Sequence, residues 1–186
     1  MKLIVGITGA TGVIYAIRLL EVLKEINNME VSLIMSEWAK KNLELETDYH
    51  LGYVEGLADQ VFDNADLGAR VSSGSFVTDG MVIAPCSMKS LSAIANGYCE
   101  SLISRAADVI LKEGRRLVLC PRETPLSAVH LENMLKLSRL GVRIVPPMPA
   151  FYNRPRGLEE IVNHQVMKIL DQFGVDSQIA KRWNGN

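Results

Sequence analysis

The sequence predicts an α/β fold, a three-layer α/β/α sandwich built on a parallel sheet. Short apolar runs, typical of strands covered on both faces, alternate along the whole chain with segments of helical spacing. Polar clusters follow several of these runs directly, and open parallel sheets bind ligands outside the carboxyl ends of their strands. Because no repeat or break in composition divides the 186 residues, we expect a single domain over residues 1–186 with one crevice at that edge.

The first predicted element is a strand, a glycine-rich turn and a helix, which together occupy residues 2–23. Gly6, Gly9 and Gly12 would let the backbone approach a ligand, and the first turn of the helix would offer N–H groups to a phosphate. The spacing is not the G-x-G-x-x-G of dinucleotide sites, and the second predicted strand (residues 31–35) leads into Ser36 rather than an acid. The turn therefore favours a phosphate cradle, and the alternative is a turn that only packs helix on strand.

The next segments contain one further candidate binding cluster. We expect a helix over 38–45, weak helix over 49–62 and a loop over 63–74, in which Asp63 and Asp66 are solvated. A strand over 81–84 is followed by Ser87, Lys89 and Ser90, which could donate to a phosphate or to the edge of a flavin. Ser87 would serve equally well as a helix N-cap.

The following helix and strand carry the charged candidates. In the predicted helix 101–113, Arg105 and Lys112 share a face with Asp108 between them, which favours an exposed ladder of ion pairs. The strand over 116–120 precedes Arg122 and Glu123, which could combine phosphate binding with proton transfer.

The last third of the chain repeats the alternation. We expect a helix over 126–140 that ends at Gly141, a strand over 142–145 and a stiff proline loop over 146–152 that presents Phe151 and Tyr152. A final helix over 158–173 and a polar tail follow.

Composition excludes several classes of function. With 20 Lys and Arg against 21 Asp and Glu, the net charge of −1 gives no reason to expect nucleic acid or membrane as a partner. No apolar run is long enough to span a bilayer and no signal peptide is visible. The unevenly spaced cysteines (Cys86, Cys99 and Cys120) are expected to be reduced thiols of a cytoplasmic protein. Neither they nor the scattered histidines predict a metal site.

Several motifs together resemble the UbiX-type flavin prenyltransferases, and in particular the B subunit of bacterial hydroxyarylic acid decarboxylases. The motifs are ITGATG at 7–12, ETD at 46–48, PCSMK at 85–89, RAADVxLKE at 105–113, PRExPLSxxHLENM at 121–134, PAFY at 149–152 and KRWNG at 181–185. The resemblance implies a Rossmann-like flavoprotein fold and metal-independent transfer of a dimethylallyl group from dimethylallyl phosphate to reduced FMN. It also implies a cytoplasmic homo-oligomer, often a dodecamer, whose prenylated FMN serves a UbiD-type decarboxylase.

The same resemblance implies roles for individual residues. FMN would be bound by Gly9, Ala10, Thr11, Ser36, Ser87, Met88, Lys89, Ser90 and Arg122. The prenyl phosphate would contact Tyr152 and Lys168, with Arg105 and Lys112 nearby from a neighbouring subunit. Glu46 and Glu123 would handle protons, the Thr11 hydroxyl would take part in catalysis, and Trp183 would close over the prenyl chain.

Three positions depart from the commonest pattern of that family. Thr11 stands in place of Ser, Met88-Lys89 in place of a Thr-Gly pair, and Lys168 in place of Arg, which exchanges a guanidinium fork for a point charge. One alternative is therefore a non-catalytic subunit that binds and delivers FMN. The related phosphopantothenoylcysteine decarboxylases are a weaker alternative, because their P-x-M-N-x-x-M-W block is replaced here by PPMPAFY.

Overall fold

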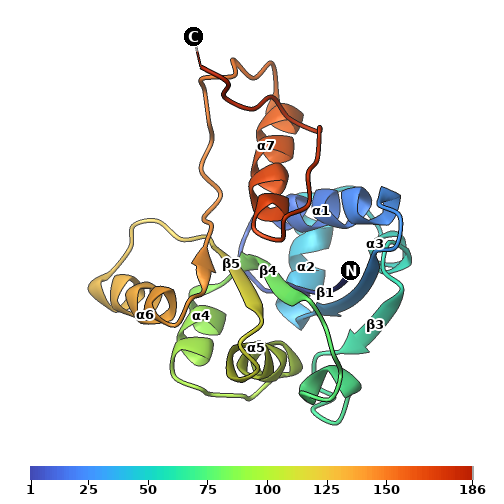
Figure 1. Ribbon diagram of the computed structural model, residues 1–186, viewed down its shortest axis with the longest axis vertical. Coiled ribbons are helices and arrows are strands. Elements are labelled where there is room, and N and C mark those ends of the chain that lie inside the picture. The colour runs from blue at the N-terminus through green and yellow to red at the C-terminus, as the bar shows by residue number, and fades with distance from the viewer. Residues whose placement is uncertain (186) are drawn as a thin grey trace.

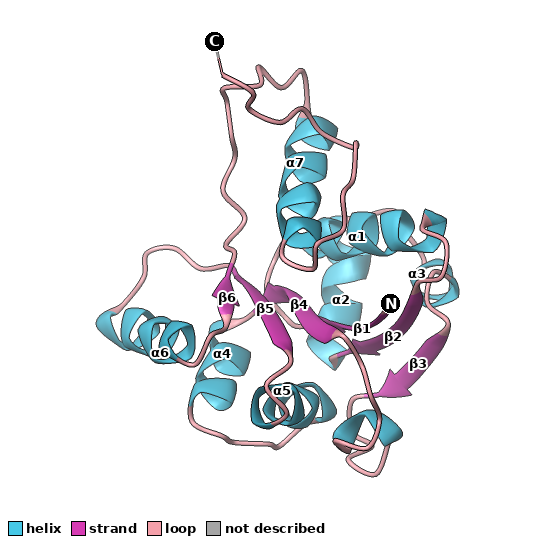
Figure 2. Cartoon of the chain, viewed as in Figure 1, coloured by secondary structure: helices cyan, strands magenta, loops and turns pink. Residues whose placement is uncertain are grey.

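A computed structural model describes residues 1–185 and has one six-stranded parallel sheet with helices on both faces (Figures 1 and 2). The strand order is β3-β2-β1-β4-β5-β6, and every neighbouring pair is parallel. The strands are β1 (Lys2–Ile7), β2 (Glu30–Met35), β3 (Gln60–Asp63), β4 (Gly80–Cys86), β5 (Arg116–Pro121) and β6 (Arg143–Ile144). The predicted fold class is confirmed.

The helices form the two outer layers. One face of the sheet carries α1 (Val13–Glu25), α2 (Glu37–Glu46), α3 (Leu51–Gly56) and α7 (Leu158–Asp171). The other carries α4 (Met88–Ala95), α5 (Leu102–Lys112), α6 (Ala128–Arg139) and the short 3₁₀ helix η1 (Arg70–Ser72). Beyond β6 the chain runs outward in an extended segment and returns as α7. The C-terminal tail runs back past the first turns of α7 (Figure 1).

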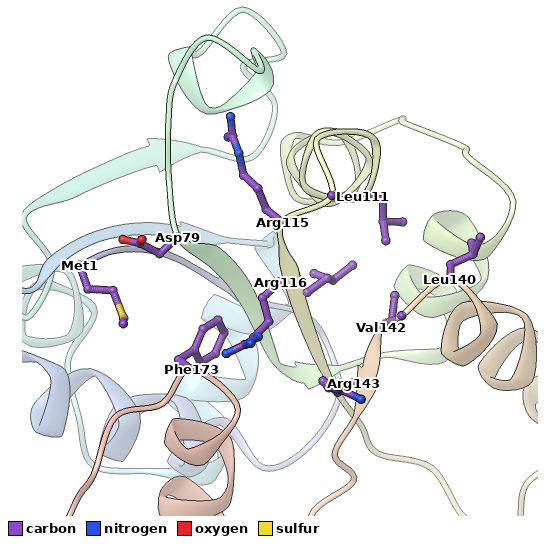
Figure 3. Close-up of a pocket in the computed structure, with 12 residues that line it drawn as sticks. Met1, Asp79, Leu111, Arg115, Arg116, Leu140, Val142, Arg143 and Phe173 are labelled. Carbon is purple, nitrogen blue, oxygen red and sulfur yellow. The ribbon is translucent and has the colours of Figure 1, made fainter.

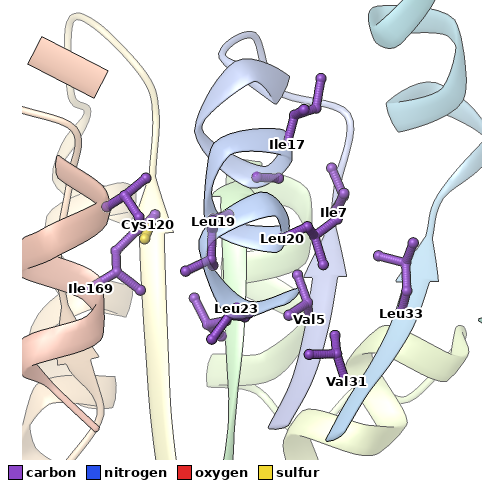
Figure 4. Close-up of a cluster of buried hydrophobic side chains, with 14 of the residues drawn as sticks. Val5, Ile7, Ile17, Leu19, Leu20, Leu23, Val31, Leu33, Cys120 and Ile169 are labelled. Atoms are coloured by element: carbon purple, nitrogen blue, oxygen red, sulfur yellow. The ribbon is translucent and has the colours of Figure 1, made fainter. Parts of the chain in front are cut away.

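The larger core lies between the sheet and α1 (Figure 4). Val5 and Ile7 of β1 point to this face, whereas Ile4 points to the opposite core, as the two-residue period of a strand requires. Ile17 and Leu20 of α1 are fully buried in this core. The β1–turn–α1 unit is therefore held rigidly, and it places the glycine turn at the carboxyl edge of the sheet.

Some predicted boundaries are wrong. Residues 60–63, expected as weak helix and loop, form β3, which is a short edge strand with alternating exposure. The helix expected from residue 126 begins at Ala128, because Ser127 caps it by accepting a hydrogen bond from the His130 N–H. The strand expected over 142–145 is reduced to two residues, and Gly141 takes a positive φ of 88° just after α6.

The order of the strands predicts where a ligand binds. From β1 the chain passes to β2 on one side, and it later enters β4 on the other side. A crevice opens at the carboxyl ends of strands where the direction of winding reverses in this way.

Candidate functional site

A cavity of about 220 Å³ lies at this switch point. Five residues predicted to bind the cofactor line it: Gly9, Ser36, Ser87, Lys89 and Ser90. They come from the loops that follow three different strands, β1, β2 and β4. The structure therefore brings together residues that are up to 81 positions apart in the chain.

The serines that line the cavity all lie at the starts of helices. Ser36 caps α2 by accepting a hydrogen bond from the Ala39 N–H, and Ser87 caps α4 by accepting one from the Ser90 N–H. Ser101 and Ser104 form a capping box at the start of α5 and also line the cavity. Three helix N-termini thus direct partial positive charge toward one space, which suits an anion.

Ser101 and Ser104 were missed as cavity residues. A polar Ser-x-x-Ser before an apolar run is a signal for the start of a helix. Because Ser101 does not follow a strand, however, the sequence offered no reason to place it beside Ser36 and Ser87.

Thr8 joins the carboxyl ends of β1 and β4. Its Oγ1 donates to the Pro85 carbonyl oxygen at 2.9 Å and accepts from the Ser87 N–H at 2.7 Å. The side chain is 2% exposed and also borders the cavity. Thr8 was missed by sequence reasoning, yet its hydroxyl sets the spacing of the two loops that carry Gly9 and Ser87.

Replacing Thr8 by Val should lower the free energy of unfolding by about 1–3 kcal/mol, because the partly buried Ser87 N–H loses its acceptor while side-chain shape is kept. Urea unfolding of the FMN-free protein measures this, and we also expect weaker FMN binding. Thr8→Ser, which keeps the hydroxyl and loses a methyl, is the matched control. Equal stability of the Val and Ser variants would show that the hydroxyl does not hold the two strands.

The first turn of α1 does not offer the free N–H groups that the sequence predicted. The Glu46 Oε2 accepts from the Gly12 N–H at 2.8 Å and from the Val13 N–H at 3.2 Å. The carboxylate of α2 thus takes the place expected for a phosphate at this helix end. That part of the prediction is wrong, and the serine-lined cavity offers the better anion site.

The glycine turn is further shaped by α2. Asn42 Nδ2 donates to the Ala10 carbonyl oxygen at 3.0 Å, and a Cβ added to Gly9 would lie 2.4 Å from the Cβ of Trp38. Thr11 is exposed at the tip of the turn, in the residue before Gly12. Ala10, Thr11 and Glu46 therefore form a second group beside the cavity without lining it.

Arg122 and Glu123 follow β5 at the same edge of the sheet. The Arg122 N–H donates to the Cys86 carbonyl oxygen at 3.2 Å, which places this turn beside Ser87. Both side chains are exposed, and Glu123 Oε1 accepts from the Thr124 N–H at 3.0 Å. An exposed carboxylate and an exposed guanidinium at this edge could act on a ligand that extends out of the cavity.

The residues predicted to bind the prenyl phosphate gather on and around α7. The Tyr152 hydroxyl lies 2.8 Å from Nε2 of His164, and the Trp183 ring contacts the Tyr152 ring edge-on with centroids 5.6 Å apart. Lys168 lies one helical turn beyond His164, and its Nζ is 3.3 Å from Oδ2 of Asp171. The structure thus groups Tyr152, Trp183 and Lys168 around α7, and their action on the prenyl phosphate stays a prediction. His164 was missed by sequence reasoning.

Electrostatics in this cluster follow from burial and charge pairing. Burial lowers the pKa of His164, and the nearby Lys168 ammonium lowers it further. The pKa of the Asp171 carboxyl is lowered, chiefly by its hydrogen bonds to Arg182 at 2.7 and 3.0 Å. The Asp171–Arg182 pair anchors the tail that carries Trp183.

Arg105 and Lys112 lie outside the cavity. Arg105 pairs with Asp108 at 2.9 Å, as the predicted ladder requires, but Lys112 pairs with Glu113 instead. Lys112 stands at the far end of α5 from Ser101, next to Gly74. The fold of one chain therefore does not bring these two cations to its own candidate site.

A larger hollow of about 510 Å³ lies at the opposite, amino-terminal edge of the sheet (Figure 3). Asp79, Arg116 and Phe173 belong to its lining, and it includes none of the predicted site residues.

Within residues 1–185, no group of three or more His, Cys, Asp or Glu side chains could hold a metal ion. No helix in that range is both long and apolar enough to cross a membrane.

The parallel sheet, with an anion-suited cavity at its switch point, has the architecture of a flavoprotein, and the family described as Flavoprotein matches residues 1–170. Flavin prenyltransferase LpdB of Lactiplantibacillus plantarum is 56% identical over 185 residues, covering 100% of this chain and 99% of its own. Flavin prenyltransferase UbiX of Escherichia coli is 50% identical over 186 residues, covering 99% and 98%. The chain belongs to the UbiX-like flavin prenyltransferase family.

Two solved structures agree with this assignment. A dodecameric FMN-dependent UbiX-like decarboxylase from Escherichia coli matches with a TM-score of 0.98 and 58% identity over 100% of both chains. AnUbiX (PadA1), in complex with FMN and dimethylallyl pyrophosphate, matches with a TM-score of 0.97 and 50% identity over 99% of this chain and 97% of its own.

Proposed function

We propose that this chain is a flavin prenyltransferase that joins a dimethylallyl group from dimethylallyl phosphate to reduced FMN. The observation that carries the proposal is the convergence of three serine-capped helix N-termini on the cavity at the switch point. Such a cavity suits the phosphate of FMN, and the cluster on α7 supplies a cation and a phenol for a second phosphate. The FMN and prenyl pyrophosphate bound to AnUbiX support both assignments.

The residues would divide the work as follows. Ser36, Ser87, Ser90, the glycine turn and Arg122 would hold FMN, which when reduced supplies the nucleophilic nitrogen. Lys168 and Tyr152 would stabilise the charge that gathers on the departing phosphate, as fixed donors do without a metal ion. Glu123 and Glu46 would transfer protons, and Trp183 would cover the prenyl chain.

Assembly would complete this site. Arg105 and Lys112 would reach the prenyl phosphate of a neighbouring subunit, and their absence from the lining of the cavity of their own chain supports this. Three large aliphatic side chains of α6 are more than half exposed, as expected of a helix covered by another copy: Val129, Leu131 and Leu135. A dodecamer like that of the Escherichia coli relative would supply such contacts.

We propose a UbiD-type decarboxylase as the enzyme that uses the prenylated FMN, and the cytoplasm as the location of this chain.

Mass spectrometry of the flavin tests the proposed function. The protein is incubated with reduced FMN and dimethylallyl phosphate, with and without EDTA, and the released flavin should carry one added prenyl group in both cases. Unmodified FMN from protein that binds it tightly would indicate a subunit that only binds and delivers FMN. Loss of the product in EDTA, restored by magnesium, would contradict metal-independent transfer.

Lys168→Ala should raise KM for dimethylallyl phosphate without changing FMN affinity. Loss of a charged hydrogen bond costs about 1.5–3 kcal/mol, which corresponds to roughly 10- to 150-fold in KM. Lys168→Arg should retain the low KM because a guanidinium also matches phosphate. The matched control is Lys24→Ala, in the last turn of α1. A KM unchanged in both Lys168 variants would place this lysine outside the donor site.

A further inference from the structure

His164 is a buried imidazole that contacts a half-exposed phenol. It lies on α7 and is 7% exposed, whereas Tyr152 is 49% exposed. Its Nε2 is 2.8 Å from the Tyr152 hydroxyl, and the two rings meet edge-to-face with centroids 5.7 Å apart. The imidazole therefore holds the phenol from the protein side and leaves its other side to solvent or to a ligand.

The proton count at this contact decides what the phenol can offer to a ligand. A tyrosine hydroxyl has one proton and two lone pairs, and a neutral imidazole has one proton on one of its two nitrogens. If Nε2 accepted the phenol proton, the oxygen would present only lone pairs to a phosphate. If Nε2 carries the imidazole proton and donates it, the Tyr152 O–H is free to donate outward.

We propose that His164 is a positioning residue that donates its Nε2–H to the Tyr152 oxygen and so directs the phenol O–H toward the prenyl phosphate. The inference rests on the proposed role of Tyr152 as a ligand of that phosphate.

Two neighbours support this role. The Trp183 ring packs edge-on against Tyr152, so two aromatic groups restrict the phenol. Burial and the Lys168 ammonium lower the pKa of His164, the Asp171 carboxylate raises it, and the net shift is downward, which favours the neutral imidazole. Because Lys168 follows His164 by four residues, both project from the same side of α7, and one helix face can present a cation and an oriented phenol to one anion.

Substitutions that move a single hydrogen-bond donor test the inference. Gln at 164 places its terminal amide near the position of Nε2, whereas Asn is too short and places its amide near Nδ1. His164→Asn should raise KM for dimethylallyl phosphate about tenfold, as expected for one lost hydrogen bond, with kcat changed much less. His164→Gln should restore most of the affinity. FMN affinity should be unchanged in both variants, and the dissociation constant of dimethylallyl phosphate on protein loaded with oxidised FMN should follow KM.

A double-mutant cycle with Tyr152→Phe separates positioning from a direct or structural role. In the Tyr152→Phe background, His164→Asn should change KM by less than about twofold, because its only route to the phosphate is gone. A full tenfold effect in that background, or no effect of His164→Asn in the native background, overturns the inference. If Tyr152→Phe itself leaves KM unchanged, the proposed donor site fails and the inference fails with it. If Tyr152→Phe raises KM while His164→Asn does not, only the role of His164 is refuted.

Discussion

Glu123→Gln should lower the rate of prenyl transfer by about 10²–10⁴-fold while FMN stays bound, because the amide keeps the shape of the side chain and cannot exchange a proton. Glu123 follows β5, its side chain is exposed at the edge of the sheet that carries the cavity, and its neighbour Arg122 is tied through its backbone to Cys86. A carboxylate in this place can reach a ligand that extends from the cavity, and its loss should affect turnover far more than binding.

Single-turnover kinetics and FMN titration of the same variant measure the two effects separately. Glu132→Gln is a matched control, since that carboxylate is also exposed and lies on α6. Glu123 Oε1 accepts a hydrogen bond from the Thr124 N–H, and a Gln amide oxygen can accept it too, so the turn should be kept. An unchanged rate would assign Glu123 to the structure of this turn instead.

Gly9→Val should abolish FMN binding and destabilise the fold by about 3 kcal/mol, at the upper end of what overpacking costs. The sequence explains this loss by the close approach of the backbone to a phosphate, whereas the structure explains it by a clash with Trp38. A Cβ at Gly9 would lie 2.4 Å from the Cβ of Trp38, so the side chain would push α2 away from the glycine turn. Glu46 and Asn42 hold that turn from the same helix, and they would move with it.

Thermal unfolding and FMN fluorescence test this expectation, with Gly52→Val as the control because a Cβ at Gly52 has nothing within 4 Å. A second substitution separates the packing clash from loss of a ligand contact. Gly9→Ala already introduces the clashing Cβ, and adding Trp38→Gly removes the atom that it meets, so the double variant should regain part of the stability that Gly9→Ala loses. Full FMN affinity in a folded Gly9→Val protein would mean that the glycine turn does not take part in binding.

The sequence by itself determined the α/β class, the β1–turn–α1 unit and the polar residues that follow β2, β4 and β5. These features are local, because the period of apolar residues distinguishes buried strands from helices. β3 escaped detection for the same reason. Its four residues alternate in exposure at the edge of the sheet and include no continuous apolar run. Its identity depends on pairing with β2, which no local pattern specifies.

Only the tertiary structure decided which polar groups meet. Glu46 caps a helix that begins 33 residues earlier in the chain, and Thr8 joins two strands through an oxygen 77 residues away. His164 reaches Tyr152 because the chain runs out after β6 in an extended segment and then returns as α7. Hydrogen bonds act over about 3 Å, and residues distant in sequence come that close only when helices and strands pack. The sequence therefore predicts which types of side chain form the candidate site. Packing alone decides that Glu46 accepts hydrogen bonds at the N-terminus of α1, and that Arg105 and Lys112 do not line the cavity.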